Sequence, residues 1–155
     1  MPSQLVAKEL ARSFQIGRQK VSVLRGVDLN VELGESVFLC GASGAGKTTL
    51  LYTLAGLETP EAGTVEFEGQ SLYALGSDRL ARLRNRRMGF VFQSYFLLPE
   101  LTAVENVIIP AMMGGRDASA RAGELLDRVG LSHRRDHLPS ELSGGEQQRV
   151  AIARA

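Results

Sequence analysis

Gly41-Ala42-Ser43-Gly44-Ala45-Gly46-Lys47-Thr48 is the stretch that decides the fold of this 155-residue chain. It matches the phosphate-binding pattern G-x-x-x-x-G-K-[ST] at every fixed position. The apolar run 37–40 before it predicts a short buried strand, and residues 47–57 after it predict a helix. A glycine-rich loop between a strand and a helix is the setting in which this pattern binds phosphate, so a flexible turn with an exposed lysine is the weaker interpretation.

The residue types of this loop suit a triphosphate. Glycines let backbone N–H groups converge on an anion because no Cβ blocks its approach, and the following helix points its positive end at the same place. Lys47 can reach the outer phosphates as a point charge, and the Thr48 hydroxyl can ligate Mg²⁺. Thr49 is one residue further on and is expected to contact a phosphate oxygen. The sequence therefore predicts phosphate contacts from Gly41, Ala42, Ser43, Gly44, Ala45, Gly46, Lys47, Thr48 and Thr49.

A second glycine-bearing segment is Leu142-Ser143-Gly144-Gly145-Glu146-Gln147. Its Ser143 and Glu146 fit the capping box S-x-x-E, so one interpretation is a well-capped helix and nothing more. Its two glycines favour another interpretation, because each costs about 0.5–1 kcal/mol relative to alanine inside a helix. They open the backbone to a ligand, and the segment would form a second anion site. Two copies of the chain paired head to tail could then hold each triphosphate between the two kinds of site.

The remaining pattern predicts strands followed by helices. Alternation over residues 27–33 and 64–68 predicts half-buried strands, with Val65 and Phe67 on one face, and residues 88–92 predict a strand that ends at Gln93. Helices are expected over 77–86, from Thr102 to Pro110, and over 117–129 with a cap at Gly130. This order indicates an α/β core with a helical insertion before Leu142.

Composition and charge exclude several classes of protein. Eighteen basic and seventeen acidic residues give a net charge of +1, which does not fit a dedicated nucleic-acid binder. The arginine-rich run 79–87 is therefore interpreted as a solvated helix face. The first residues lack the apolar region of a signal peptide, and no apolar run is long enough to cross a bilayer. The single cysteine, Cys40, is expected to be a buried thiol in a reducing cytosol.

Together, the two glycine-bearing segments and Gln93 resemble the nucleotide-binding subunits of ABC transporters. The resemblance implies that Phe14 stacks on adenine and that Gln93 senses Mg²⁺, the attacking water and a transmembrane partner. It implies that the segment from Ser143 through Gly144 and Gly145 to Glu146 is the ABC signature, with Glu146 where many members have Gln. Ser143 and Gly145 would then contact the γ-phosphate of ATP held by the other subunit. Lipoprotein-releasing (LolD-like), macrolide-export (MacB-like) and FtsE-like ATPases are the subfamilies resembled by residues 83–85, 88–93, 97–99, 101–107 and 139–145.

This resemblance implies an α/β fold of the P-loop NTPase class, with an antiparallel β subdomain and a helical subdomain. We expect a β subdomain and P-loop core over 1–93, a helical subdomain over 94–141 and the signature with its helix over 142–155. Lys47 and Gln93 would be catalytic, and Thr48 and Gln93 would hold Mg²⁺. The implied function is ATP hydrolysis in a head-to-tail dimer, coupled to a permease subunit at the inner face of the membrane that docks on residues 95–98. No nucleic-acid partner is expected.

One part of the family pattern has no match in these 155 residues. The family has a Walker B segment, in which apolar residues precede Asp-Glu, and later a switch histidine. The nearest apolar run, Leu125-Leu126-Asp127, lies in an expected amphipathic helix, and His133 and His137 precede the signature. We therefore expect a truncated piece with an incomplete core, poor stability on its own and no meaningful ATP turnover.

Two other functions fit the same motifs. The first is a soluble ABC ATPase that acts on DNA, although the hundred or so residues between the motifs hold neither heptads nor cysteine pairs. The second is a fragment that binds nucleotide without turnover. The transported substrate is not predicted, so lipoprotein release, macrolide export and cell-wall control stay open.

Overall fold

The computed structural model describes residues 3–155, which form two compact units that divide between Ala81 and Arg82. The first unit holds the antiparallel sheet and the glycine-rich loop, and the second is helical. The division at residues 93 and 141 expected from the sequence stays a prediction.

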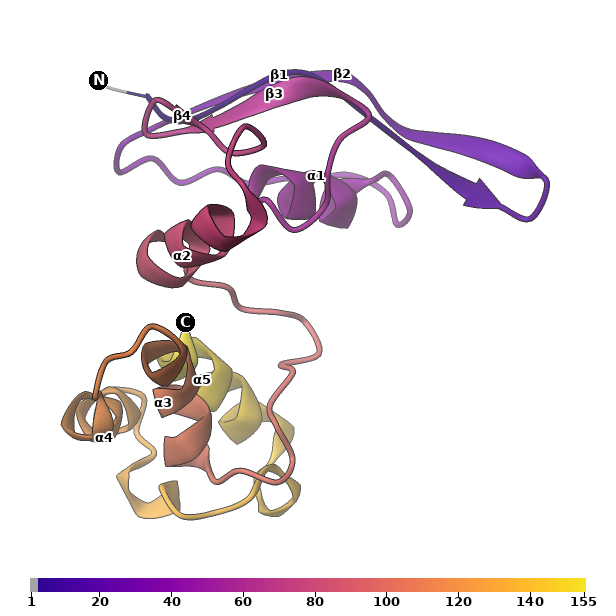
Figure 1. Cartoon of the computed structure of the whole chain (residues 1–155). Helices are drawn as coiled ribbons and strands as arrows, with labels where there is room; N and C mark the ends of the chain where they lie inside the picture. The colour runs from indigo at the N-terminus through magenta and orange to yellow at the C-terminus, as the bar shows by residue number, and fades with distance from the viewer. Residues whose placement is uncertain (1–2) are drawn as a thin grey trace. The chain divides into compact units, whose positions relative to one another are not determined.

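The sheet of the first unit has four strands in the order β2-β1-β3-β4, all paired antiparallel (Figure 1). The strands are β1 (Ser3–Ile16), β2 (Gln19–Glu32), β3 (Ala62–Phe67) and β4 (Gln70–Ser71). The sequence predicted β3 and the second half of β2. It did not predict β1, because register shifts between Ala7 and Leu10 interrupt the two-residue alternation of buried side chains.

Helix α1 (Lys47–Leu54) follows the glycine-rich loop and buries Leu50, Thr53 and Leu54. The sheet contributes Ala7, Leu10, Leu24, Val65 and Phe67 to the buried side chains of this unit. Val65 and Phe67 lie on one face of β3, as the alternation predicted. The core of the first unit thus lies on the face of the sheet that carries the helix after the loop.

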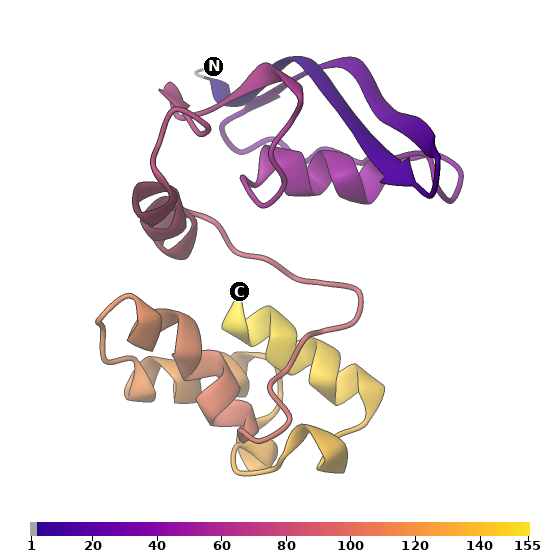
Figure 2. The ribbon, with the colours of Figure 1, turned by 45° about the vertical axis from the view of Figure 1, so that its right-hand side comes forward.

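Helix α2 (Ser77–Arg87) crosses the division between the units, and the second unit continues with α3 (Ala103–Met113), α4 (Ser119–Arg128) and α5 (Gly144–Arg154). Short 3₁₀ turns at Ser132–Arg134 and Pro139–Glu141 connect α4 to α5. Figure 2 shows α3, α4 and α5 as one group of helices. Their shared core consists of Ala103, Val107, Ala122, Leu126, Leu131, Leu142, Val150 and Ala153.

Two strands expected from apolar runs are not formed. Residues 37–40 and 88–92 have no regular secondary structure, and Phe38 is 89% exposed. A strand needs a neighbouring strand to satisfy its backbone groups, and no described strand pairs with either run. Cys40, expected to be buried, is exposed for the same reason.

Helix α3 also differs from its predicted length. Pro110 was expected to end it, but α3 continues to Met113 and ends at Gly114. A proline inside a helix removes one backbone donor and its ring crowds the carbonyl four residues earlier, yet here residues 111–113 stay helical. The Asn85 side chain donates a hydrogen bond of 2.7 Å to the Pro110 carbonyl, which supports the helix at this point. Within residues 3–155, no helix is both long enough and apolar enough to cross a bilayer.

Candidate nucleotide-binding site

The glycine-rich loop requires glycine at Gly46 for two reasons. Its φ of 87° lies in the left-handed region, and a Cβ there would lie 2.7 Å from Val23 Cγ1 of β2. Gly44 has a φ of 77° with open space around it, so only its backbone conformation favours glycine. The loop therefore packs against β2 at one end and is exposed along the rest of its length.

Lys47 is folded back over this loop. Its Nζ donates hydrogen bonds to the carbonyls of Gly41 (2.7 Å) and Ala42 (2.6 Å). An ammonium group held this way places a positive charge at the centre of the loop. A phosphate entering the loop could replace these carbonyls as the acceptor.

The first turn of α1 is open to an anion. Gly46 is the N-cap and supplies no capping side chain, and the first turn carries no acidic residue. The helix N-terminus thus presents backbone N–H groups and the positive end of the helix dipole. Thr48 is exposed at this end, whereas Thr49 is half-buried and accepts a hydrogen bond from Thr53 through its carbonyl.

The residues around Thr48 suit Mg²⁺ only together with a bound phosphate. No group of three His, Cys, Asp or Glu side chains among residues 3–155 could hold a metal ion. Mg²⁺ commonly keeps several waters and binds through one or two protein oxygens plus substrate phosphates. One exposed hydroxyl beside a phosphate-binding loop fits that donor set.

Phe14 lies in the hairpin that also contacts the loop. It pairs with Val21 across β1 and β2, and the next register shift leaves Val23 unpaired, against Gly46. Bulged residues commonly re-aim side chains in this way. The guanidinium carbon of Arg12 lies 4.9 Å from the centroid of the Phe14 ring, so a cation already covers one face of the ring.

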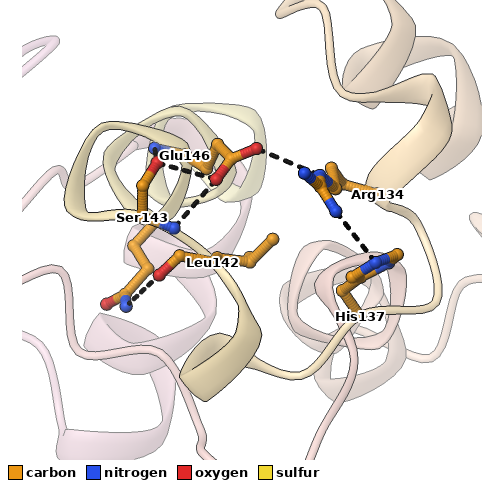
Figure 3. Close-up of polar contacts among 6 residues, drawn as sticks. Arg134, His137, Leu142, Ser143 and Glu146 are labelled. Atoms are coloured by element: carbon orange, nitrogen blue, oxygen red, sulfur yellow. Dashed lines mark hydrogen bonds and ion pairs between the residues drawn. The ribbon is translucent and has the colours of Figure 1, made fainter.

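Ser143 and Glu146 form the capping box that the sequence predicted (Figure 3). The Glu146 amide donates to Ser143 Oγ at 3.3 Å, and Glu146 Oε2 accepts from the Ser143 amide at 2.8 Å and from its hydroxyl at 2.7 Å. Gln147 donates to the carbonyls of Pro139 (2.9 Å) and Leu142 (3.1 Å), which fixes the chain before the cap. The start of α5 is thus well ordered by its own side chains.

The two glycines after Ser143 are not required by this fold. A Cβ at Gly144 or Gly145 would have its nearest neighbour at 3.9 Å, which is ordinary contact, and neither residue has a positive φ. Both are exposed, as is Ser143. The predicted cap is therefore formed, but capping does not require the two glycines, which leave the start of α5 exposed.

The Glu146 carboxylate is held in its charged form. Hydrogen bonds from the Ser143 hydroxyl and amide, and then the positive charge of Arg134, lower its pKa to about 2. Arg134 Nε donates to Glu146 Oε1 at 3.1 Å, and Arg134 Nη1 lies 3.1 Å from His137 Nε2. The sequence pattern did not single out Arg134, whose only signal is that it is a basic residue in the segment that precedes the capping box.

Gln93 is exposed in a turn before a loop with an unusual backbone. Tyr95 and Phe96 have φ values of 60° and 48°, in the left-handed region that non-glycine residues rarely adopt. Arg154, at the end of α5, donates to the carbonyls of both residues at 2.6 Å. The helix that begins at Ser143 therefore also supports the loop after Gln93.

The predicted residues fall into two groups. Phe14 and residues 41–49 lie in the first unit, and Gln93 and residues 143–146 lie in the second. Each group forms a separate half-site with its own supporting contacts. Their roles toward a nucleotide stay predictions.

Comparison with known proteins identifies the family of this chain. The sequence profile of the ABC transporter family matches residues 24–155. The lipoprotein-releasing system ATP-binding protein LolD of Myxococcus xanthus is 51% identical over 97% of this chain and 69% of its own length. The protein of the same name from Geobacter metallireducens is 51% identical over the whole of this chain and 70% of its own length.

Solved structures give the same result. A dimeric structure of the ATP-binding cassette MJ0796 in a post-hydrolysis state, bound to ADP and Pi, matches with a TM-score of 0.90 and 38% identity. The match covers 97% of this chain and 68% of the cassette. A DNA-acting ATPase, the predicted alternative, has no support in these comparisons. The glycine-rich loop at residues 41–48, the capped glycine segment at residues 142–147 and these matches together show that the chain belongs to the ABC transporter family, as an ATP-binding subunit with the fold of an ABC cassette.

Proposed function

We propose that this chain is the ATP-binding subunit of a lipoprotein-releasing transporter and that two copies bind ATP between them. The observation that carries the proposal is the exposed start of α5, where folding does not require glycine at Gly144 or Gly145. In a chain that also holds a P-loop, this exposed helix start can bind the γ-phosphate of a nucleotide held by a second copy. The names of the relatives from Myxococcus xanthus and Geobacter metallireducens support the choice of substrate class.

In this proposal the first unit binds MgATP. Residues 41–46 surround the phosphates with backbone N–H groups, and Lys47 exchanges its two carbonyl partners for phosphate oxygens. Thr48 ligates Mg²⁺, and Thr49 contacts a phosphate oxygen through its backbone or hydroxyl. Adenine stacks on the face of Phe14 that Arg12 leaves open.

The second unit completes the site of a partner copy. Ser143, Gly144 and Gly145 bring a hydroxyl, backbone N–H groups and a helix N-terminus to the γ-phosphate. Hydrogen bonds to a charged group contribute about 1.5–3 kcal/mol each, so several of them would make dimerisation depend on ATP. The dimeric structures of the cassette MJ0796 support such an assembly.

We place the protein at the inner face of the membrane through a permease subunit. The loop after Gln93 exposes Phe96 (60%) and Leu98 (45%), and apolar loop residues that stay exposed often mark a partner surface. Gln93 lies at the start of this loop and would report the state of the nucleotide to the permease.

We further infer that residues 1–155 by themselves bind nucleotide without appreciable turnover. Phosphoryl transfer needs a metal ion that is held by both the protein and the phosphates, and a water molecule oriented for attack. Within this sequence no Asp-Glu pair follows an apolar run, so the metal site proposed at Thr48 lacks the acidic pair that the family pattern supplies. Phosphate release from these residues as fast as that from the chain extended past Ala155 would contradict this inference.

The test of the proposed function is ATP-dependent dimerisation of the complete encoded protein. With ATP and EDTA, which prevents Mg²⁺-dependent turnover, sedimentation should show a dimer for the wild type and a monomer for Ser143→Ala. Ser143→Ala should still bind a fluorescent ATP analogue as a monomer, whereas Lys47→Ala should lose that binding. A Ser143→Ala protein that dimerises like the wild type would contradict the shared site, and retention on DNA without any membrane partner would contradict the transporter.

A further inference from the structure

The two oxygens of the Glu146 carboxylate have different partners. Oε2 accepts the hydroxyl and the amide of Ser143, and Oε1 accepts Arg134 Nε at 3.1 Å (Figure 3). The carboxylate therefore connects the Ser143 hydroxyl to a guanidinium from the 3₁₀ turn Ser132–Arg134, which precedes α5 in the chain.

This arrangement raises a difficulty for the proposed phosphate contact. The Ser143 hydroxyl has one proton, which it donates to Glu146 Oε2. It can donate to a phosphate only by turning away from the carboxylate. A phosphate at Ser143 would then lie beside the negative charge of Glu146, and like charges at such a separation repel strongly.

Arg134 has the charge and the fixed geometry to remove this difficulty. Its Nη1 lies 3.1 Å from His137 Nε2, and since a guanidinium only donates, that ring nitrogen is the acceptor. Its Nε is then directed to Glu146, whose side chain is 15% exposed. The Arg134 side chain itself is 36% exposed, and ion pairs near the surface add little to folding stability. The contact is therefore better suited to setting the local charge than to stabilising the fold.

We propose that Arg134 is a positioning residue for nucleotide-dependent dimerisation. It holds the Glu146 carboxylate by Oε1 and neutralises its charge, so that the Ser143 hydroxyl can turn from Oε2 to a γ-phosphate oxygen. No proton is transferred, because the hydroxyl keeps its hydrogen and changes only its acceptor. The inference rests on the proposed function, since it assumes that Ser143 reaches a phosphate.

A double-mutant cycle in the complete protein tests this proposal. The measurement is the ATP concentration that gives half-maximal dimer in the presence of EDTA, for wild type, Arg134→Met, Glu146→Gln and the double variant. Methionine keeps an unbranched apolar stem, and glutamine keeps the carbonyl oxygen without the charge. Arg134→Met should raise the required ATP about tenfold when Glu146 is present, within the range of coupling between contacting residues. It should change the required ATP by less than about twofold in the Glu146→Gln background, because no charge remains to be neutralised.

Two further variants separate charge from structure. Arg134→Lys keeps the positive charge and should recover most of the loss, and a lysine variant as weak as Arg134→Met would overturn the electrostatic role. His137→Ala removes the other partner of Arg134 and should have the smaller effect. A larger effect of His137→Ala than of Arg134→Met would overturn action through Glu146.

The outcomes distinguish this inference from the proposed function. Equal shifts from Arg134→Met in both backgrounds, or no shift in either, would overturn the role of Arg134 while leaving the function intact if Ser143→Ala abolishes the dimer. If Ser143→Ala still dimerises, the proposed function itself is wrong. Monomer binding of a fluorescent ATP analogue should match the wild type in each variant, and so should the thermal midpoints of the Arg134 and His137 variants. If Arg134→Met fails this check, Arg134→Gln replaces it in the cycle.

Discussion

Arg154, near the end of α5, donates hydrogen bonds to the carbonyls of Tyr95 and Phe96, each at 2.6 Å. Ser143 caps the start of the same helix, so a single helix carries the capped glycine turn at one end and the support of the Gln93 loop at the other. Burial lowers the pKa of Arg154, but an arginine side chain stays charged at any ordinary pH.

Replacing Arg154 should loosen the loop after Gln93. Without the guanidinium, two carbonyls lose their donors while Tyr95 and Phe96 keep a strained backbone, which costs on the order of 1–3 kcal/mol for each residue. We expect Arg154→Ala to destabilise the protein by about 2–3 kcal/mol. Arg154→Lys should restore only part of this, because an ammonium lacks the planar fork. Denaturant unfolding would measure the stability, and hydrogen exchange of residues 94–98 that stays as slow as in the wild type would contradict the prediction.

Replacement of glycine by alanine should destabilise the protein at Gly46 and stabilise it at Gly144. Gly46→Ala places a Cβ 2.7 Å from Val23 Cγ1 at a φ of 87°, so we expect a loss of about 1–3 kcal/mol and of nucleotide binding. Gly144→Ala makes only an ordinary contact, with the Tyr95 hydroxyl at 3.9 Å, within a helix and should stabilise the monomer by up to about 1 kcal/mol. Its ATP-dependent dimerisation should nevertheless weaken, because the added methyl lies where the partner's phosphate is placed. Thermal midpoints and sedimentation with ATP would test both, and a Gly144→Ala protein that dimerises normally would count against a ligand at this turn.

Asn106 should be essential for the loop that precedes α3. It is fully buried, its side-chain oxygen accepts the Leu98 amide at 2.8 Å, and its amide group donates to the carbonyls of Leu98, Leu101 and Thr102. Asn106→Leu is similar in volume but leaves these backbone groups without partners. Each buried unsatisfied group costs about 1–3 kcal/mol, so we expect a loss of about 3 kcal/mol or more. Thr102→Ala, at the exposed cap of the same helix, is the matched control and should cost about 1 kcal/mol. A loss no larger than that of the control would show that water replaces these bonds.

The sequence predicted best where local chemistry decides the structure. The capping box at Ser143 requires only residues within one turn, and it formed. The P-loop was also local, since its glycines, lysine and following helix are adjacent in the chain. These segments could be located without knowing what packs against them.

Prediction failed where the structure depends on distant partners. Residues 37–40 have the composition of a buried strand, yet burial needs neighbours that no described strand provides, and Phe38 stays exposed. The contacts of Arg134 and Arg154 were missed for a related reason. An arginine has many available partners, and the sequence does not show which carboxylate or carbonyl a turn brings to it.

Acid should remove the contribution of Glu146 to the start of α5. Its pKa in the folded protein is about 2, lowered from an ordinary value of 4.5, so the folded state favours the charged form. A group with a lowered pKa stabilises fully above its unfolded value, and its contribution is lost as the pH falls through the folded value. The stability difference between wild type and Glu146→Gln should therefore be constant above about pH 5 and shrink from there toward pH 2.

Thermal unfolding of the two proteins over this pH range would measure the effect. Glu124→Gln is the matched control, because Glu124 pairs with Arg121 on the exposed face of α4 and takes no part in a cap. The control separates the loss of one carboxylate from the loss of this particular cap. If the difference between wild type and Glu146→Gln instead grew as the pH fell, the folded protein would favour the neutral acid. The hydrogen bonds from Ser143 and Arg134 could then not be the ones that hold Glu146 charged.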